Sequence, residues 1–184
     1  RNGAEAARPG YDFVVQAEAG LMSITGAADG EPAKVGVAVA DLAAGQYAAF
    51  AILAALRQRD ATGRGQRIDV SLFEAQLANL ANVASNVLFT DEEARRHGNA
   101  HASIVPYQAF RAADEDFALA VASEKLWRAF CGALDRPEWL ADPRCRDNAA
   151  RVVHREWLCG ELAALFAAAP AAHWLERLQA AGVP

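Results

Sequence analysis

Apolar segments separated by glycine-rich breaks dominate the first part of the chain. Residues 11–22 carry apolar side chains at helical spacing, which predicts a short helix. An alanine-rich segment from Asp41 to about Arg59 predicts a longer helix that is apolar on nearly every face. Such a helix is expected to be buried all round, as in the interior of a layered α/β domain.

The next segment changes from a turn to a strand and then to a helix. Residues 60–67 have the composition of a turn, residues 68–72 are strand-like, and residues 73–89 return to helical apolar spacing. The charged cluster at residues 91–96 marks a shift in composition, so we expect a domain boundary near residue 95.

Strand and helix signals both follow this charged cluster. Residues 107–111 and 117–122 flank an acidic turn, which predicts a hairpin. Amphipathic patterns predict helices at residues 124–134 and 148–168, and a last helix is expected to begin near Pro170. The pattern therefore predicts an α/β chain made of two pieces.

The composition supports a folded core and argues against a nucleic-acid partner. The chain is 53% hydrophobic and 22% charged, and its net charge is −5. Cys131, Cys145 and Cys159 form an odd set without CxxC spacing. We therefore expect buried, reduced thiols and a cytoplasmic protein.

Neither a leader nor a membrane anchor is predicted from the sequence. No apolar segment follows the polar start at residues 1–8. The longest apolar run, residues 42–56, is too short for a membrane span and contains Gly45 and Gln46. Because the chain starts without methionine and stops as it leaves a helix, we expect it to be part of a longer protein.

The histidines do not form a metal-ligand set. His97 and His101 lie close together but lack a third ligand, and His154 and His173 belong to separate helical segments. We therefore expect no metal site.

Asp41 is the residue best placed to carry chemistry. It lies at or beside the start of the long apolar helix, where the helix dipole and unpaired backbone N–H groups favour an ionised carboxylate. A carboxylate held ionised in an apolar setting can attack an acyl carbon, and Gly45, one turn later, would leave room for a substrate. Spacing alone is more typical of an ordinary helix cap, and it permits a nucleophile without requiring one.

An ordered series of short motifs, running through essentially the whole chain, resembles the family III CoA-transferases. That family, also called CaiB/BaiF, includes formyl-CoA transferase-like enzymes and α-methylacyl-CoA racemases. The matching segments are residues 8–12 (RPGYD), 20–26 (GLMSITG), 35–45 (VGVAVADLAAG), 52–56 (ILAAL), 62–66 (TGRGQ), 68–72 (IDVSL), 98–101 (GNAH), 105–110 (VPYQAF) and 181–184 (AGVP).

The resemblance implies that Asp41 is the nucleophile of a CoA-transferase. It would attack an acyl-CoA thioester to give a mixed anhydride, which CoA converts to an aspartyl-CoA thioester before the acceptor acid reverses the steps. The implied substrates are an acyl-CoA and a small organic acid. Residues along the bound CoA would be Arg8, Pro9, Gly10, Tyr11 and Asp12, and the substrate loop would be Gly98, Asn99, Ala100 and His101. Some transferases have several consecutive glycines in that loop, whereas this chain has only Gly98.

Two alternatives remain beside the transferase. Racemases of the family have a histidine at the position of Tyr11, and a phenol is a poor base at neutral pH. Glu124 aligns roughly with a further acidic residue of the racemases, although a glutamate is also typical of a helix start. The third possibility is a non-catalytic fragment or interaction module in which Asp41 is only a cap.

The resemblance also implies the architecture. Residues 1–95 would belong to a large Rossmann-like, CoA-binding domain, and residues 96–184 would form a small α+β domain. Family members are interlocked homodimers, and neither a membrane nor a nucleic acid is an expected partner.

Overall fold

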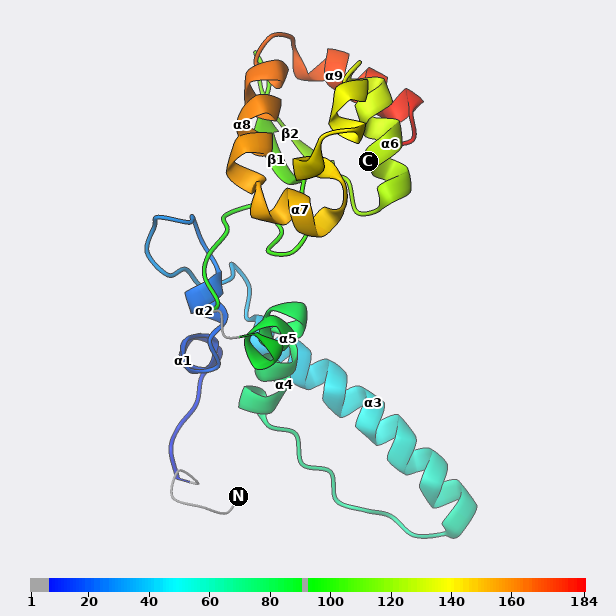
Figure 1. The fold of residues 1–184 in the computed structure, drawn as a ribbon. Helices are drawn as coiled ribbons and strands as arrows, with labels where there is room; N and C mark the ends of the chain where they lie inside the picture. The colour runs from blue at the N-terminus through cyan, green and yellow to red at the C-terminus, as the bar shows by residue number, and fades with distance from the viewer. Residues whose placement is uncertain (1–6, 91–92) are drawn as a thin grey trace. The chain divides into compact units, whose positions relative to one another are not determined.

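A computed structural model describes residues 7–90 and 93–184 and divides the chain into two compact units (Figure 1). The first unit ends at Gly98, and the second runs from Asn99 to Pro184. The assignment of the first to a Rossmann-like domain stays a prediction, as does that of the second to a small α+β domain.

The regular secondary structure in the described residues of the first unit consists of helices joined by loops. Its longest helix packs against α4, and α1 contacts both of these helices. The elements are α1 (Asp12–Glu18), α2 (Leu21–Ile24), α3 (Val39–Thr62), α4 (Leu72–Ala78) and α5 (Ala81–Phe89).

Two predicted helices of this unit are interrupted, and one predicted strand is wrong. The helix expected at residues 11–22 breaks at Gly20. Its φ of 86° lies in the left-handed region, which glycine adopts without steric cost. The helix expected at residues 73–89 is divided into α4 and α5. Residues 68–71 form no strand, because in the described part of this unit no neighbouring strand shares backbone hydrogen bonds with them.

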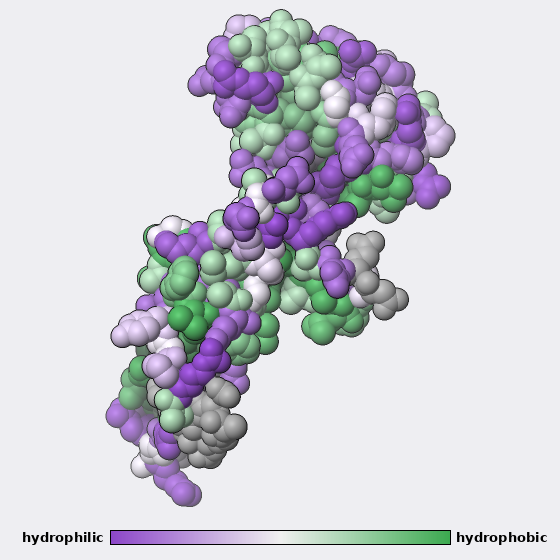
Figure 2. Space-filling view, turned by 90° about the vertical axis from the view of Figure 1, so that its left-hand side faces the viewer, coloured by the Kyte–Doolittle hydropathy of each residue, from purple (hydrophilic) through white to green (hydrophobic). Residues whose placement is uncertain are grey.

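The α3 helix forms as predicted, but its environment differs from the prediction. Only Ala40 and Ala43, near its start, are buried, whereas Phe50 and Leu53 are 70% and 64% exposed. Figure 2 shows apolar patches on one face of the molecule. A helix that is apolar all round is buried only where other elements cover each face. Among the described residues, α1 and α4 are its main neighbours, and they leave most of it uncovered.

The second unit combines a hairpin with several helices. Its strands β1 (Tyr107–Arg111) and β2 (Asp116–Ala120) pair antiparallel, with Phe110 opposite Phe117, which confirms the predicted hairpin. The predicted helix at residues 148–168 divides at His154. The helical elements are α6 (Glu124–Ala133), α7 (Asn148–Val153), α8 (Arg155–Phe166) and α9 (Ala171–Ala180), with short 3₁₀ turns at Pro137–Leu140 and Pro143–Cys145.

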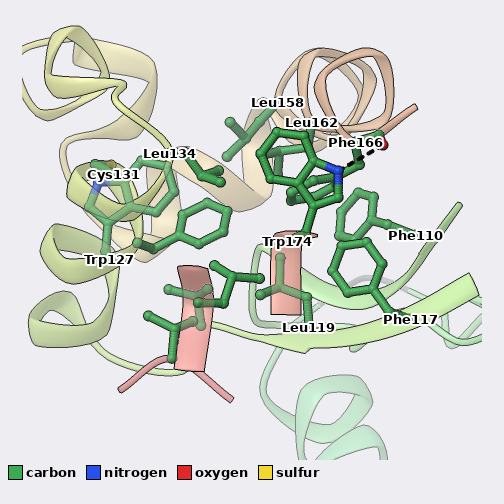
Figure 3. Close-up of a cluster of buried hydrophobic side chains, with 14 of the residues drawn as sticks. Phe110, Phe117, Leu119, Trp127, Cys131, Leu134, Leu158, Leu162, Phe166 and Trp174 are labelled. Atoms are coloured by element: carbon green, nitrogen blue, oxygen red, sulfur yellow. Dashed lines mark hydrogen bonds between the residues drawn. The ribbon is translucent and has the colours of Figure 1, made fainter. Parts of the chain in front are cut away.

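Phe166 is fully buried in the core of the second unit, where it lies beside Phe110 and Trp174 (Figure 3). The rings of Phe110, Phe117 and Trp174 meet it edge-on, with centroids 4.9–5.3 Å away. Trp174 Nε1 donates a hydrogen bond to the Phe166 carbonyl oxygen at 2.9 Å. The alternation of Phe117 and Leu119 on β2 thus places two apolar side chains inward, as a half-buried strand requires.

Most of the tryptophans belong to this core, as predicted. Trp127 and Trp139 are buried and stacked, with ring centroids 6.2 Å apart, and Trp174 is also buried. Trp157 is partly buried under the Arg144 guanidinium, which lies 3.5 Å from its ring centroid.

By length and composition alone, one helix in the described part of the chain could cross a membrane, and it is α3. The α8 and α9 helices would meet the same criterion only as one span bent by 113°. The run at residues 42–56 is too short by itself, but the helix extends beyond it at both ends, so that prediction underestimated the segment. A core helix covered by protein passes the same test.

Candidate functional site

Asp41 lies in the first turn of α3, and its side chain is exposed. The helix begins at Val39, so Asp41 is the third helical residue rather than the cap. Here the positive end of the dipole favours a negative charge. Apart from its chain neighbours and the backbone of its own helix, no described heavy atom lies within 4 Å of a Cβ built on Gly45, one turn further on. This part of α3 therefore presents an accessible carboxylate beside an open backbone.

The segment before Asp41 is held by two side chains of α1. Asp12 Oδ1 accepts a hydrogen bond from the Ala40 backbone N–H at 2.8 Å. Asp12 Oδ2 accepts from Gln16 Nε2 at 2.7 Å, and Gln16 Oε1 accepts from the Val35 N–H at 2.9 Å. Gln16 is completely buried. Sequence reasoning missed Gln16, whose only signal is a polar residue on the buried face of an amphipathic helix.

The residues predicted along CoA lead into α1. Tyr11 precedes the helix and is 77% exposed, and Arg8, Pro9 and Gly10 are also exposed. The Arg8 guanidinium forms an ion pair with Glu18. Because α1 contacts the helix that carries Asp41, the structure brings this segment into the same unit as the candidate nucleophile. Contact between these residues and CoA stays a prediction.

The predicted substrate loop is divided between the two units. Gly98 has a left-handed φ of 59°, and its N–H donates to the Gly26 carbonyl at 3.1 Å within the first unit. Asn99, Ala100 and His101 belong to the second unit. An approach of this loop to Asp41 therefore stays a prediction.

His101 has a defined environment within its own unit. Its Nδ1 accepts from the Ser103 N–H at 3.0 Å, and its ring centroid lies 5.3 Å from that of Tyr107. Arg155 Nη2 donates to the carbonyls of both His101 and Ala102, at 2.9 and 2.8 Å. A neutral His101 thus carries its proton on Nε2, and the end of the loop is anchored to α8.

Glu124, the residue considered for a racemase, is engaged by Arg151. The guanidinium of this fully buried arginine donates to both Glu124 carboxylate oxygens, at 2.7 and 3.2 Å. It also donates to the Val105 carbonyl at 2.9 Å and lies 4.6 Å from the Trp127 ring centroid. This arrangement gives Glu124 a structural role in the second unit. Sequence reasoning missed Arg151, because an arginine within a helix is usually exposed.

The thiols do not provide a second nucleophile. Burial raises the pKa of Cys131 to about 12 and that of Cys145 to about 11, and burial also raises the pKa of Cys159. Since the thiolate is the reactive form, these cysteines are poor nucleophiles at neutral pH. Within residues 7–90 and 93–184, no group of three His, Cys, Asp or Glu side chains could hold a metal ion.

Comparison with known proteins gives consistent matches over the whole chain. The sequence model of the family described as CoA-transferase family III matches residues 1–184. The chain is 43% identical to succinyl-CoA:glutarate CoA-transferase of Mus musculus and 37% identical to acetyl-CoA:oxalate CoA-transferase of Acetobacter aceti. Each match covers 96% of this chain, but only 41% and 46% of the respective relative.

Solved structures give the same picture. The crystal structure of a CAIB/BAIF family protein from Brucella suis matches all of this chain with a TM-score of 0.75 and 38% identity. A hypothetical protein (Rv3272) from Mycobacterium tuberculosis matches with a TM-score of 0.83 and 29% identity. The match covers 48% of each solved chain, so this chain spans less than half the length of these relatives.

Proposed function

This chain belongs to CoA-transferase family III, and from this membership we propose that it carries the nucleophile of a CoA-transferase, Asp41. The single observation that supports this role best is the position of Asp41. Its carboxylate is exposed in the first turn of a long helix, with open space beside Gly45. A nucleophile needs both a favoured charge and access to its substrate.

The proposed reaction begins with attack by a carboxylate oxygen of Asp41 on the thioester carbon of an acyl-CoA. A C–O bond forms, the C–S bond breaks, and CoA leaves as the thiolate. The product is a mixed anhydride between the acyl group and Asp41. The positive end of the α3 dipole lies beside the negative charge of the attacking carboxylate and stabilises it.

The second half transfers CoA to the protein and then to the acceptor. The CoA thiolate attacks the aspartyl carbonyl carbon, releases the donor acid and leaves an aspartyl-CoA thioester. The acceptor carboxylate then attacks this thioester, breaks its C–S bond and forms a second mixed anhydride with release of CoA thiolate. The thiolate attacks the acceptor's acyl carbon in that anhydride, which releases the new acyl-CoA and regenerates the Asp41 carboxylate. Each step produces an oxyanion that backbone N–H donors can stabilise.

We further propose small dicarboxylates as substrates and the RPGYD segment, residues 8–12, as part of the CoA site. The named relatives act on succinyl-CoA with glutarate and on acetyl-CoA with oxalate. Tyr11 is exposed, and the exposed Arg8 is paired with Glu18, so we assign the contact with a nucleotide or pantetheine to this side of the segment and not to the Asp12 carboxylate, which binds Ala40 and Gln16. We also propose that the complete protein is a cytoplasmic homodimer. The loop at Gly98–His101 would close over the acyl group during the reaction.

A racemase is less well supported by the geometry than a transferase. Proton exchange at an α-carbon needs a second base opposite Asp41. Tyr11 supplies a phenol in place of an imidazole, and the Glu124 carboxylate is bound by Arg151. Exchange of the α-proton without an acceptor acid would support the racemase.

Hydroxylamine trapping during turnover tests the proposed function. The complete native chain that contains these residues is incubated with succinyl-CoA, glutarate and hydroxylamine. Hydroxylamine should convert the acylated Asp41 to a hydroxamate, and mass spectrometry of peptides locates this modification. Asp41→Asn should lower the rate of transfer by at least about a thousandfold. Asp29→Asn, an exposed carboxylate of the same unit, serves as the control and should keep full activity.

Two results would contradict the assignment. One is a hydroxamate found at another carboxylate while Asp41 stays unmodified. The other is an Asp41→Asn protein that transfers CoA at the wild-type rate.

A further inference from the structure

We propose that Asp12 is a positioning residue for the nucleophile. Its carboxylate caps α3 from another helix and, together with Gln16, fixes the backbone that leads into Asp41. This inference rests on the proposed function of Asp41.

The α3 helix has no cap of its own. Its N-cap position is Ala38, which has no side-chain hydrogen-bond acceptor. The first N–H groups of a helix point outward without helical acceptors and need a partner from elsewhere. The Ala40 N–H finds this partner in Asp12 Oδ1 at 2.8 Å, across 28 residues of sequence. Because a carboxylate is used, the cap also opposes the positive end of the helix dipole.

Gln16 extends this contact into a small network. Its Nε2 donates to Asp12 Oδ2 at 2.7 Å and approaches the Val37 carbonyl oxygen at 3.4 Å, while its Oε1 accepts from the Val35 N–H. Asp12 and Gln16 thus bind three points of the segment at residues 35–40. Since Gln16 is fully buried, water competes little for these contacts.

The network determines where the Asp41 carboxylate can lie. Asp41 follows Ala40 directly, so a shift of the helix start moves the nucleophile relative to the bound thioester. Covalent catalysis depends strongly on this placement, and a displacement of about 1 Å can cost about a hundredfold in rate. Both Asp12 oxygens are used inside the unit, which separates this role from a contact with CoA through the same carboxylate.

Replacing Asp12 should reduce turnover without weakening CoA binding. In the complete native chain, Asp12→Ala should lower kcat about a hundredfold and slow hydroxamate formation at Asp41 in parallel. The KM for the acyl-CoA should stay within about threefold, because an interaction that acts only on the reacting group changes kcat. Asp12→Asn keeps an oxygen for the Ala40 N–H but turns an NH2 group toward the Gln16 Nε2 donor, so its loss of about tenfold should be smaller than that of Asp12→Ala.

Gln16→Ala provides a second variant that leaves the Asp12 carboxylate in place. It should also lower kcat with little change in KM, but by less than Asp12→Ala does, because the Asp12 contact with the Ala40 N–H remains. Hydrogen exchange at the Ala40 amide, measured by mass spectrometry, should be faster in Asp12→Ala than in the wild type. Asp29 is an exposed carboxylate of the same unit, and Asp29→Ala is the matched control. It should change neither kcat nor the rate of hydrogen exchange at the Ala40 amide.

Several results would overturn the positioning role. A raised KM with an unchanged kcat would show that Asp12 contacts CoA, and an Ala40 amide that exchanges no faster in Asp12→Ala than in the wild type would exclude the capping hydrogen bond as the cause. A fully active Asp12→Ala beside an inactive Asp41→Asn overturns the role of Asp12 alone. If Asp41→Asn itself keeps transferring CoA, the proposed function fails, and faster exchange at Ala40 would then report only on the helix cap.

Discussion

At the level of single residues, Arg151 is the most strongly held charge in the second unit. It is buried, pairs with Glu124, binds two backbone carbonyls and lies over the Trp127 ring. Removing one partner of a buried ion pair is costly because the remaining charge is left without compensation. Glu124 is therefore expected to contribute to stability rather than to proton transfer.

Glu124→Ala should destabilise the second unit by about 2 kcal/mol, because the buried Arg151 guanidinium loses a hydrogen-bonded counter-charge that is itself 43% exposed and partly screened by solvent. Urea unfolding of the complete native chain, followed by tryptophan fluorescence, measures the change. The exposed pair between Arg111 and Asp116 is the matched control, and Asp116→Ala should cost less than about 1 kcal/mol. Equal losses in the two variants would contradict a special role for the buried pair.

The buried thiols predict a loss of stability in alkaline solution. The pKa of Cys131 is raised from 9.0 to about 12, and that of Cys145 from 9.0 to about 11, mainly by burial. Above pH 9.0 the unfolded chain therefore releases thiol protons that the folded chain keeps. The free energy of unfolding should fall as the pH rises from 9.0 toward about 11, and should be unaffected by these groups below that window.

Urea unfolding at several alkaline pH values measures this fall. A double variant, Cys131→Ala with Cys145→Ala, should show a shallower dependence on pH than the wild type. If both proteins lose stability equally, other groups cause the alkaline effect.

At the level of elements, two helices are capped by carboxylates from distant segments. The α3 helix uses Asp12, and α9 uses Asp114 in the turn of the hairpin. Asp114 Oδ1 accepts from the Ala171 N–H at 2.8 Å, whereas the N-cap residue Pro170 makes no side-chain cap. Capping of this kind joins elements that are separate in sequence, so α9 and the hairpin are expected to lose structure together.

Asp114→Ala should lower the Tm of the second unit at neutral pH. The hydrogen bond from the Ala171 N–H is the main cause that lowers the pKa of Asp114 below 3.8. Stability from a lowered carboxyl pKa is present above 3.8 and is lost as the pH falls through the folded-state pKa. Thermal unfolding should therefore separate the wild type from the variant at neutral pH and show converging Tm values below pH 3.8.

Glu115→Ala, in the same turn, is the control and should leave the Tm unchanged. A difference between wild type and Asp114→Ala that persists in strong acid would mean that the charge is not responsible.

Local patterns were sufficient to predict many of these elements, but not their contacts. The hairpin was predictable because alternation and an acidic turn are neighbours in sequence. The start of α3 near Asp41 was predictable for the same reason. The Asp12 cap and the partner of Glu124 were not, because both join residues far apart in the chain. The burial of α3 was predicted wrongly for these residues, since burial depends on which other segments cover the helix.

At the level of the whole molecule, two observations have a common explanation: α3 is largely uncovered, and this chain matches only part of the length of its relatives. The match covers less than half of each named relative, and α3 exposes large apolar side chains including Phe50 and Leu53. An exposed apolar surface of this kind is typical of an interface with further protein. We expect further segments of the native protein to cover it.

Phe50→Ala and Leu53→Ala should each destabilise the complete native chain by about 3 kcal/mol, as expected for covered core positions. Chemical denaturation measures this loss. Gln58→Ala, an exposed position of the same helix, should stay within about 0.5 kcal/mol.

Losses near zero at Phe50 and Leu53, combined with co-sedimentation of the wild type with phospholipid vesicles, would contradict cover by protein. That result would instead indicate that α3 contacts lipid.

The cap that Asp12 places on α3 has a consequence for engineering new acyl specificities by recombination. A crossover between the codons of Asp12 and Ala40 would join the carboxylate of one parent to the helix start of the other. In hybrids with this junction, Asp41 and the Asp12 carboxylate that caps its helix would come from different parents. Libraries that exchange α1 and the start of α3 as a single block should retain active members more often.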